Sequence, residues 1–335
     1  MRHILVGGDG FVGRFLAEDL ANRGQQVIVA DIVKSDLPHY ARVEFIHLDV
    51  TDRSAFDKLP LKPDDMVYNL SARMLSPILP RAQRYDFFYP VNTAGTAHIL
   101  DWMEKAGARK LVHYTTDMVY GHTKTVPTTE DHPTEPLGHY GASKLETEKM
   151  CEAYRAKGFD ISIFRPRLII GPGRLGILAK LFKLVDKNLP IPMIGSGRAP
   201  YQFISVFDCA KAARLAWEKG VPNSVYNLGS KNPPPVRELL GKLIKEANSK
   251  SILVPTPAPL TKFALNMFDR VNLPIMDPEQ YLIADEECVL DTTKAERELG
   301  WRADHRDEDM LIAAYREYKA GRSIADATER GKAAA

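Results

Sequence analysis

The stretch Gly7-Gly8-Asp9-Gly10-Phe11-Val12-Gly13 decides the fold, because it joins an apolar strand pattern, Ile4–Val6, to a helical pattern, Phe11–Arg23. Its glycines match two spacings, GxxGxxG and GxGxxG, that are typical of a dinucleotide-binding turn. Such a turn must be tight, must let the backbone approach a pyrophosphate, and must pack the helix closely on the strand. The positive end of the helix then faces the phosphates. We therefore predict that this loop binds a dinucleotide through Gly7, Gly10, Phe11, Val12 and Gly13.

Outward from this turn, short apolar runs alternate with helical patterns over the first two-thirds of the chain. We predict strands at Ile4–Val6, Val27–Ala30, Val43–His47, Met66–Leu70, Lys110–Tyr114, Ile161–Phe164 and Val225–Leu228. The helices between them are predicted at Phe11–Arg23, Ser54–Lys58, Val91–Ala106 and Tyr140–Arg155. This alternation is typical of βαβ units. We therefore predict an α/β fold, a doubly wound parallel sheet of the Rossmann type, with a second, smaller mixed α/β substrate lobe.

The texture of the sequence changes after about Gly171, where proline and glycine become frequent. Helices are still predicted at Leu175–Asp186, Val236–Ala247, Thr293–Leu299 and Asp309–Ala320. We assign residues 1–170 and about 200–230 to the nucleotide-binding domain, and about 171–199 and 230–321 to the substrate lobe. Residues 322–335 form a tail, whose polar, alanine-rich end we expect to be frayed.

Composition and charge exclude several classes of protein. The chain has 335 residues, 44% of them hydrophobic, so a disordered protein is excluded. Lys plus Arg is 45 and Asp plus Glu is 43, so the basic excess of a nucleic-acid binder is absent. The three cysteines are far apart and the histidines are scattered, so we expect no metal site. Without a leader pattern or an apolar run of membrane length, we expect a cytoplasmic protein with no membrane partner.

An acidic residue closes the second predicted strand. Asp31 lies 18 residues beyond Gly13, where a carboxylate accepts hydrogen bonds from the adenosine ribose hydroxyls and repels a 2′-phosphate. The nearest cation is Lys34, and no arginine follows at once. The sequence therefore predicts NAD rather than NADP.

The spacing YxxxK occurs three times, at Tyr120, Tyr140 and Tyr315, so the context must choose among them. Tyr315 lies on the last predicted helix, far along the chain from the nucleotide site. Tyr120 precedes a stretch rich in helix breakers. Tyr140 stands at the head of a good helix, where it shares one face with Lys144.

This pair suits hydride-transfer chemistry. An unperturbed tyrosine, with a pKa near 10, is a poor base at neutral pH, but a nearby ammonium stabilises its phenolate. Tyr140 could then remove a hydroxyl proton while the same carbon loses a hydride, a proton transfer worth roughly 10²–10⁴ in rate. Lys144 could also bind ribose hydroxyls. Thr116, at the end of the fifth predicted strand, could hydrogen-bond the substrate oxygen.

At this point the chain resembles the extended short-chain dehydrogenases, the NAD-dependent epimerase/dehydratase family. The likeness runs from Met1 to about Gly321. The segments that carry it are GGDGFVG, Asp31, Leu48-Asp49-Val50, Asn69-Leu70-Ser71-Ala72, Val91-Asn92-Thr93-Ala94-Gly95-Thr96, TTDMVYG, YGASK, Arg165-Pro166, Gly171-Pro172-Gly173, Phe203-Ile204-Ser205-Val206-Phe207-Asp208 and Glu298-Leu299-Gly300-Trp301.

The resemblance implies roles for these positions. Asp49 and Val50 would flank the adenine of NAD, and Leu70, Ser71 and Ala72 would line the path of the pyrophosphate and ribose. Tyr140 and Lys144 would be the catalytic pair, with Thr116 as the hydroxyl partner of the substrate. Asn92 could be either a ligand or a residue that kinks its helix.

The departures from the family pattern concern the substrate. Dehydratases typically carry Asp-Glu after the threonine, and here the pair is Asp117-Met118, which disfavours sugar dehydration. Leu168 replaces an Asn that touches the sugar diphosphate, and Tyr201 replaces a phosphate-clamping Arg. Arg198 could substitute only if its loop bends. A later Arg is missing from Met276–Leu290. These departures weaken the expected contacts to a nucleotide diphosphate.

Other side chains are candidates for the substrate lobe. Arg165, Arg167 and Arg174 bracket a glycine-proline turn and could form an anionic pocket, or could pair with nearby carboxylates. We take Asp117, Arg167, Arg174, Arg198 and Tyr201 as substrate-contact candidates. Phe263, Met267 and Phe268 are expected in the core; their exposure in the cleft would instead favour an apolar substrate.

The leading hypothesis is an NAD-dependent epimerase that transiently oxidises a ring hydroxyl of a sugar or nucleotide sugar, with NAD held tightly. The alternative is a net NAD-dependent alcohol dehydrogenase similar to the hydroxysteroid dehydrogenase branch. A third reading is a non-catalytic NAD-binding protein, against which the set Thr116, Tyr140 and Lys144 argues. By resemblance we also expect a homodimer built on the helices Val91–Ala106 and Tyr140–Arg155.

Overall fold

The computed structural model describes residues 1–36, 38–75, 77–173, 175–176 and 178–321. The expected tail, residues 322–335, and the candidate Arg174 therefore lie outside the described residues. Within the described residues, no helix combines the length and the apolar character needed to cross a membrane.

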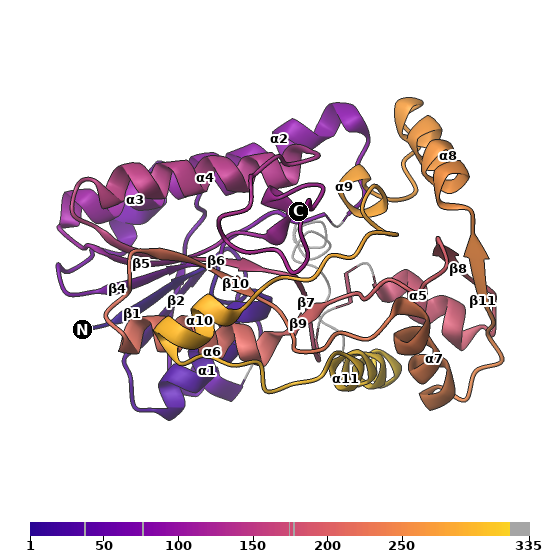
Figure 1. Cartoon of the computed structure of the whole chain (residues 1–335). Helices are drawn as coiled ribbons and strands as arrows, with labels where there is room; N and C mark the ends of the chain where they lie inside the picture. The colour runs from indigo at the N-terminus through magenta and orange to yellow at the C-terminus, as the bar shows by residue number, and fades with distance from the viewer. Residues whose placement is uncertain (37, 76, 174, 177, 322–335) are drawn as a thin grey trace.

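A seven-stranded parallel sheet forms the centre of the molecule (Figure 1), and it confirms the predicted fold class. The strand order is β10-β6-β5-β4-β1-β2-β3. Successive strands are added toward one edge of the sheet from β1 to β3 and toward the other edge from β4 on, so the order reverses between β1 and β4. In such sheets ligands bind beyond the carboxyl ends of the strands at this point of reversal. The strands are β1 (His3–Val6), β2 (Val27–Asp31), β3 (Glu44–His47), β4 (Met66–Asn69), β5 (Lys110–Tyr114), β6 (Asp160–Pro166) and β10 (Ser224–Leu228).

Helices cover both faces of this sheet. On one face α1 (Phe11–Asn22) packs beside α6 (Val206–Glu218), and on the other α3 (Gly95–Ala106) lies beside α4 (His139–Arg155), as Figure 1 shows. Successive side chains of β1 enter opposite cores, since Leu5 belongs to the first cluster and Ile4 to the second. Strands buried on both faces explain the continuous apolar runs in the sequence.

A third hydrophobic cluster, around Phe182, Leu243 and Leu311, lies beyond the sheet and is separate from the two clusters that cover its faces. We call its elements and their neighbours the small lobe: α5 (Leu178–Asp186), β8 (Ile191–Ile194), α7 (Val236–Glu246), β11 (Leu253–Thr256), α8 (Ala258–Arg270), α9 (Pro278–Tyr281) and α11 (Asp307–Lys319). β7 (Leu168–Ile170) pairs with β9 (Phe203–Ser205) between this lobe and the sheet. The proposed division into domains stays a prediction.

Several elements differ from the sequence prediction. The predicted helix Ser54–Lys58 is a 3₁₀ helix, Arg53–Lys58. The helix predicted over 91–106 begins with a wide π turn, Pro90–Ala94, because Pro90 has no N–H to donate to a regular helical ladder. The helices α6 and α8 were not predicted from the sequence. The remaining helices are α2 (Arg84–Tyr89) and α10 (Thr293–Leu299), with short 3₁₀ helices at Pro38–Ala41, Arg81–Gln83 and Asp117–Val119.

Candidate active site

The glycine turn has the geometry of an anion cradle. Gly7 has φ of +76°, and a Cβ there would lie 2.5 Å from the Ser71 nitrogen. A Cβ on Gly13 would lie 2.6 Å from the Gly8 Cα, so glycine alone lets α1 pack on the turn. Gly10, the residue preceding α1, provides no side-chain cap. The first amides of α1 are therefore available to a phosphate, and the turn fits the pyrophosphate of NAD.

Asp31 ends β2 next to this turn. One carboxylate oxygen accepts a hydrogen bond from the Asp9 amide at 3.0 Å, and the other accepts from Val33 N at 3.2 Å. Burial raises the pKa of Asp31 to about 6. Asp9 itself accepts hydrogen bonds from the hydroxyls of Ser35 and Tyr40. Two neighbouring carboxylates make this edge unfavourable for a 2′-phosphate, which agrees with the choice of NAD.

A cavity of about 390 Å³ runs from the glycine turn into the small lobe. Seven of the predicted cofactor residues line it: Gly7, Phe11, Val12, Leu70, Ala72, Tyr140 and Lys144. The others lie at or near the same carboxyl edge of the sheet, outside the cavity wall: Gly10, Gly13, Asp31, Asp49, Val50 and Ser71. The cavity therefore corresponds to the nicotinamide end of the expected cofactor path and the space beyond it.

Tyr140 and Lys144 lie in the first turns of α4, and both line this cavity. The Lys144 ammonium is buried and donates a hydrogen bond to the Tyr114 carbonyl oxygen at 3.0 Å. Burial lowers the pKa of Lys144 to about 8. The other two YxxxK tyrosines have structural contacts instead, since Tyr120 donates to Asn227 and Tyr315 donates to Asp186.

Thr116 lies directly after β5, on the same cavity. Its hydroxyl donates to the Asp117 carboxylate at 3.3 Å and accepts from Met118 N at 3.2 Å. The structure therefore brings Thr116, Tyr140 and Lys144 together from two separate elements, as the sequence predicts.

Behind Thr116 lies a buried ion pair between Asp117 and Arg167. Burial lowers the pKa of the Arg167 guanidinium, but the groups around it, the Asp117 carboxylate foremost, together raise this pKa above its ordinary value. The guanidinium carbon is 4.9 Å from the centre of the Tyr201 ring. Among the described residues, Nε and Nη2 of Arg167 have no hydrogen-bond partner. All three residues line the cavity, but the Arg167 side chain is fully buried, so a substrate acceptor reaches these nitrogens only if the side chains around them move.

Two other arginine candidates do not reach the cavity. Arg198 is exposed and lies outside the set of described residues that line it. Arg165 pairs with Glu148 and donates to the Tyr120 hydroxyl, so it takes the structural role that the sequence left open.

The far wall of the cavity is apolar, and it comes from β7, α5, β8 and α7. Leu168, at the position of the family Asn, is part of this wall. Phe263, Met267 and Phe268, expected in the core, lie instead on the exposed side of α8 and outside the cavity wall, so that expectation is wrong. The wall residues include Leu168, Ile169, Leu175, Leu178, Leu181, Pro192, Met193, Ile194, Leu239, Leu240 and Met276.

Glu279, on α9, is a site residue that the sequence analysis missed. Its carboxylate accepts hydrogen bonds from the backbone amides of Tyr140 and Gly141, both at 2.8 Å. Gly138, the residue before α4, offers no side-chain cap, and a Cβ there would lie 2.6 Å from Glu279 Oε1. Burial raises the pKa of Glu279 to about 8. The small lobe thus caps and positions the helix that carries Tyr140.

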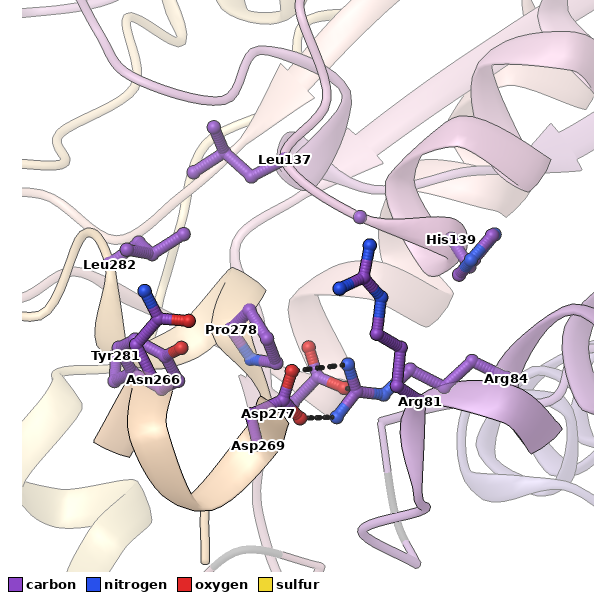
Figure 2. A pocket seen from close by; sticks show the side chains of 11 residues that line it. Arg81, Arg84, Leu137, His139, Asn266, Asp269, Asp277, Pro278, Tyr281 and Leu282 are labelled. Carbon is purple, nitrogen blue, oxygen red and sulfur yellow. Dashed lines mark hydrogen bonds and ion pairs between the residues drawn. The ribbon is translucent and has the colours of Figure 1, made fainter. Parts of the chain in front are cut away.

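A second cavity, of about 260 Å³, lies on the other side of α9 (Figure 2). Arg84 of α2 forms a buried ion pair with Asp269 of α8, and its Nε is 3.5 Å from Asp277. Figure 2 shows the side chains of Arg84, Asp269 and Asp277 next to one another. This arrangement joins the small lobe to the helices beside the sheet.

Asn92 lies in the π turn and is fully buried. Its carbonyl oxygen accepts from Arg73 N at 2.8 Å, and its amide group donates to Arg73 O and to the Ser143 hydroxyl. These contacts tie the chain after β4 to α4, which favours the structural alternative for this residue.

Comparison with known proteins identifies the family of the chain. A model of the NAD dependent epimerase/dehydratase family matches residues 3–229. An uncharacterized protein of Sinorhizobium fredii, y4nG, is 32% identical over 322 residues, which cover 96% of this chain and 79% of that protein. A putative UDP-glucose 4-epimerase of Methanocaldococcus jannaschii is 28% identical over 247 residues, or 70% of this chain and 79% of its own length.

Solved structures have the same fold. MoeE5 in complex with UDP-glucose and NAD matches with a TM-score of 0.77 at 22% identity, covering 96% of this chain and 100% of that one. The family model spans more than half of the chain, and it coincides with the sheet and its glycine turn. The chain therefore belongs to the NAD-dependent epimerase/dehydratase family, the extended short-chain dehydrogenases, and NAD is the cofactor of that family.

Proposed function

We propose that the protein is an NAD-dependent epimerase that acts on a sugar or nucleotide sugar by transient oxidation of a ring hydroxyl. The observation that carries this proposal is the convergence of Thr116, Tyr140 and Lys144 on one cavity at the carboxyl edge of the sheet. Similarity to a putative UDP-glucose 4-epimerase supports the sugar as substrate class.

Each of the three side chains has a role in this proposal. Tyr140 takes the proton of the reacting hydroxyl and later returns it, while Lys144 stabilises the phenolate and holds ribose hydroxyls of the cofactor. Thr116 hydrogen-bonds the substrate oxygen. NAD, when bound, accepts a hydride from the carbinol carbon and gives it back to the other face. Asp31 and the glycine turn would hold the adenosine ribose and the pyrophosphate.

Sugar dehydration is disfavoured by the residues around Thr116. That reaction needs an acid and a base beside the threonine, and Met118, which lines the cavity, has no proton to exchange. Asp117 is engaged by Arg167 in a buried ion pair. Both observations support epimerisation or oxidation over the loss of water.

The apolar wall supports a second candidate, a net NAD-dependent alcohol dehydrogenase on a less polar substrate. Leu168 and Tyr201 stand in the cavity where family members that bind nucleotide sugars place polar residues. The wall around them is built from leucine, isoleucine and methionine. A substrate with apolar parts would therefore be accommodated.

Absorbance of reduced nicotinamide separates the two candidates. Purified protein is incubated with NAD and a panel of UDP-linked and dTDP-linked sugars and apolar secondary alcohols. Inverted product without net NADH supports the epimerase. Stoichiometric NADH contradicts the epimerase and supports the dehydrogenase, whereas no turnover of any panel member counts against both.

Assembly and location are further proposals. We propose a homodimer through α3 and α4, although neither helix exposes a large hydrophobic side chain in this structure. We also propose a cytoplasmic location. Light scattering at micromolar concentration tests the dimer, and a monomeric mass would contradict it.

A further inference from the structure

The helix α8 has its apolar side on the outside. Leu260, Phe263, Met267, Phe268 and Val271 follow one helical stripe, and Phe263 and Val271 are 64% and 60% exposed. The stripe continues through Leu273 and Ile275, which are also exposed. We call these seven residues the α8 face. In Figure 1, α8 stands at the edge of the molecule, away from the central sheet.

The polar side of α8 is bound to the protein. Asp269 is buried in its ion pair with Arg84, as Figure 2 shows, and Lys262 pairs with Asp285. The Thr261 hydroxyl donates to Thr256 at 3.0 Å, and Asn266 lines the second cavity. These contacts fix the rotation of the helix, so the exposure of the apolar stripe is built into the fold.

This orientation is the reverse of an ordinary surface helix, which turns its apolar stripe toward the core. Large contiguous apolar patches on a protein surface mark sites of interaction. A helix with one apolar face and basic residues at its border is the form that lies in the interface of a lipid bilayer.

The charges around the α8 face select its partner. Arg270 is exposed, and the exposed Lys180 of α5 donates to the Ile275 carbonyl oxygen at 3.2 Å. The single carboxylate of residues 258–275, Asp269, is buried. A symmetric contact between two copies would bring these cations toward their own copies. An anionic bilayer is complementary to them.

We propose that the α8 face docks on the surface of an anionic lipid bilayer, with α8 lying in the plane of the interface. The expectation of no membrane partner rests on the lack of an apolar run of membrane length, and a helix that lies in the interface does not need such a run.

The position of the cavity extends this proposal to the substrate. Ile275 is exposed, and the next residue, Met276, lines the cavity together with Leu178 and Leu181 of α5. Docking would thus bring the apolar cavity wall to the membrane. If the proposed function holds, on which this clause rests, the substrate class is an alcohol or sugar carried on an apolar tail.

Vesicle flotation tests the docking. The full-length protein is mixed with vesicles of phosphatidylcholine alone and of phosphatidylcholine with phosphatidylglycerol. We expect binding to the anionic vesicles, lost at least about tenfold in the variant Phe263→Ser/Met267→Ser/Phe268→Ser because its apolar contact area is gone. Ile252→Ser is the matched control, since Ile252 is 62% exposed at the end of β11 remote from α8, and it should bind as the wild type does.

Light scattering and a soluble-substrate assay complete the experiment. The triple variant should keep the wild-type mass, melting temperature and turnover of a water-soluble alcohol. Absence of wild-type binding to anionic vesicles overturns the proposal, as does equal loss in the Ile252→Ser control. A variant that falls to half the wild-type mass would assign the α8 face to a second copy and also overturn it. Failure of turnover with intact vesicle binding would overturn the proposed function alone.

Discussion

The two ends of the cavity differ in what builds them. At the sheet end, Thr116, Tyr140 and Lys144 stand at fixed positions beyond parallel strands, and the hydroxyl of Thr116 and the ammonium of Lys144 are hydrogen-bonded. At the small-lobe end, leucine, isoleucine and methionine form most of the wall, and the charged residues among its described members are the Asp117–Arg167 pair at its border. The sheet end thus carries the groups of the proposed proton transfer, while the small lobe forms the wall that a substrate would contact.

The largest expected effect is on turnover, from a substitution at the sheet end of the cavity. Tyr140→Phe removes the proton acceptor and should lower turnover by roughly 10²–10⁴. NADH binding, followed by fluorescence, should survive because the glycine turn and Asp31 are untouched. Tyr315→Phe is the matched control, since that hydroxyl contacts Asp186 and neither residue is among the described residues that line the cavity. Unchanged turnover in Tyr140→Phe would contradict the catalytic role proposed for Tyr140.

The next largest effect concerns the buried ion pair between Arg84 and Asp269, which joins the small lobe to the helices beside the sheet. Arg84→Met leaves the buried Asp269 carboxylate without its partner and should destabilise the protein by about 3–5 kcal/mol in chemical unfolding. The double variant Arg84→Met/Asp269→Leu should recover part of this loss, because only Asp277, which keeps its hydrogen bond from Glu279 N, is left without the guanidinium. Equal stability of the single variant and the wild type would show that this ion pair does not hold the small lobe.

The cofactor edge gives a smaller effect with a pH signature. Asp31→Asn should weaken NAD binding about 10- to 100-fold, since hydrogen bonds to a charged acceptor are lost. The ratio of the affinity for NAD to the affinity for NADP should also decrease. In the wild type, the carboxylate with its pKa of about 6 is protonated below that pH. Affinity for NAD, measured by calorimetry, should therefore fall from pH 7 to pH 5 in the wild type and stay flat in the variant. An equal fall of the affinity for NAD in both proteins would show that Asp31 does not bind the ribose.

The smallest effect concerns the cap that the small lobe provides to α4. The pKa of Glu279 rises from 4.5 to about 8 on burial, so the folded state keeps a proton that the unfolded chain has released. Stability should therefore fall as pH rises from about 4.5 to 8. Glu279→Gln cannot ionise, and its stability relative to the wild type should improve by on the order of 1 kcal/mol across this window. Urea unfolding of both proteins at pH 5 and pH 8 measures this difference in stability. The same change of stability with pH in the wild type and in Glu279→Gln would contradict the prediction.

The sequence predicts the sheet end well because its demands are local. The glycine turn, Asp31 and the Tyr140–Lys144 spacing each act within a few residues, so their patterns are readable without the rest of the chain. The choice of Tyr140 over Tyr120 and Tyr315 followed from helix context alone, and the structure puts only Tyr140 of these three on the cavity.

The small-lobe end could not be predicted, because its contacts join residues far apart in the chain. Glu279 caps α4 at Tyr140, which lies 139 residues earlier in the chain, and only the glycines at 138 and 141, which leave room for it, hint at a partner. Phe263 and Met267 have the spacing of a core stripe, and periodicity cannot tell which side of a helix faces water. The missed helix α6 did carry a signal, since Ser205 caps it and its apolar residues recur at helical spacing.

A crystal structure of the protein with NAD tests the central claim most directly. The account predicts the pyrophosphate on the glycine turn, the adenosine ribose on Asp31, and the nicotinamide in the cavity with Tyr140 and Lys144 beside its ribose. A nicotinamide bound outside that cavity, or a Tyr140 hydroxyl directed away from it in the complex, would contradict the account.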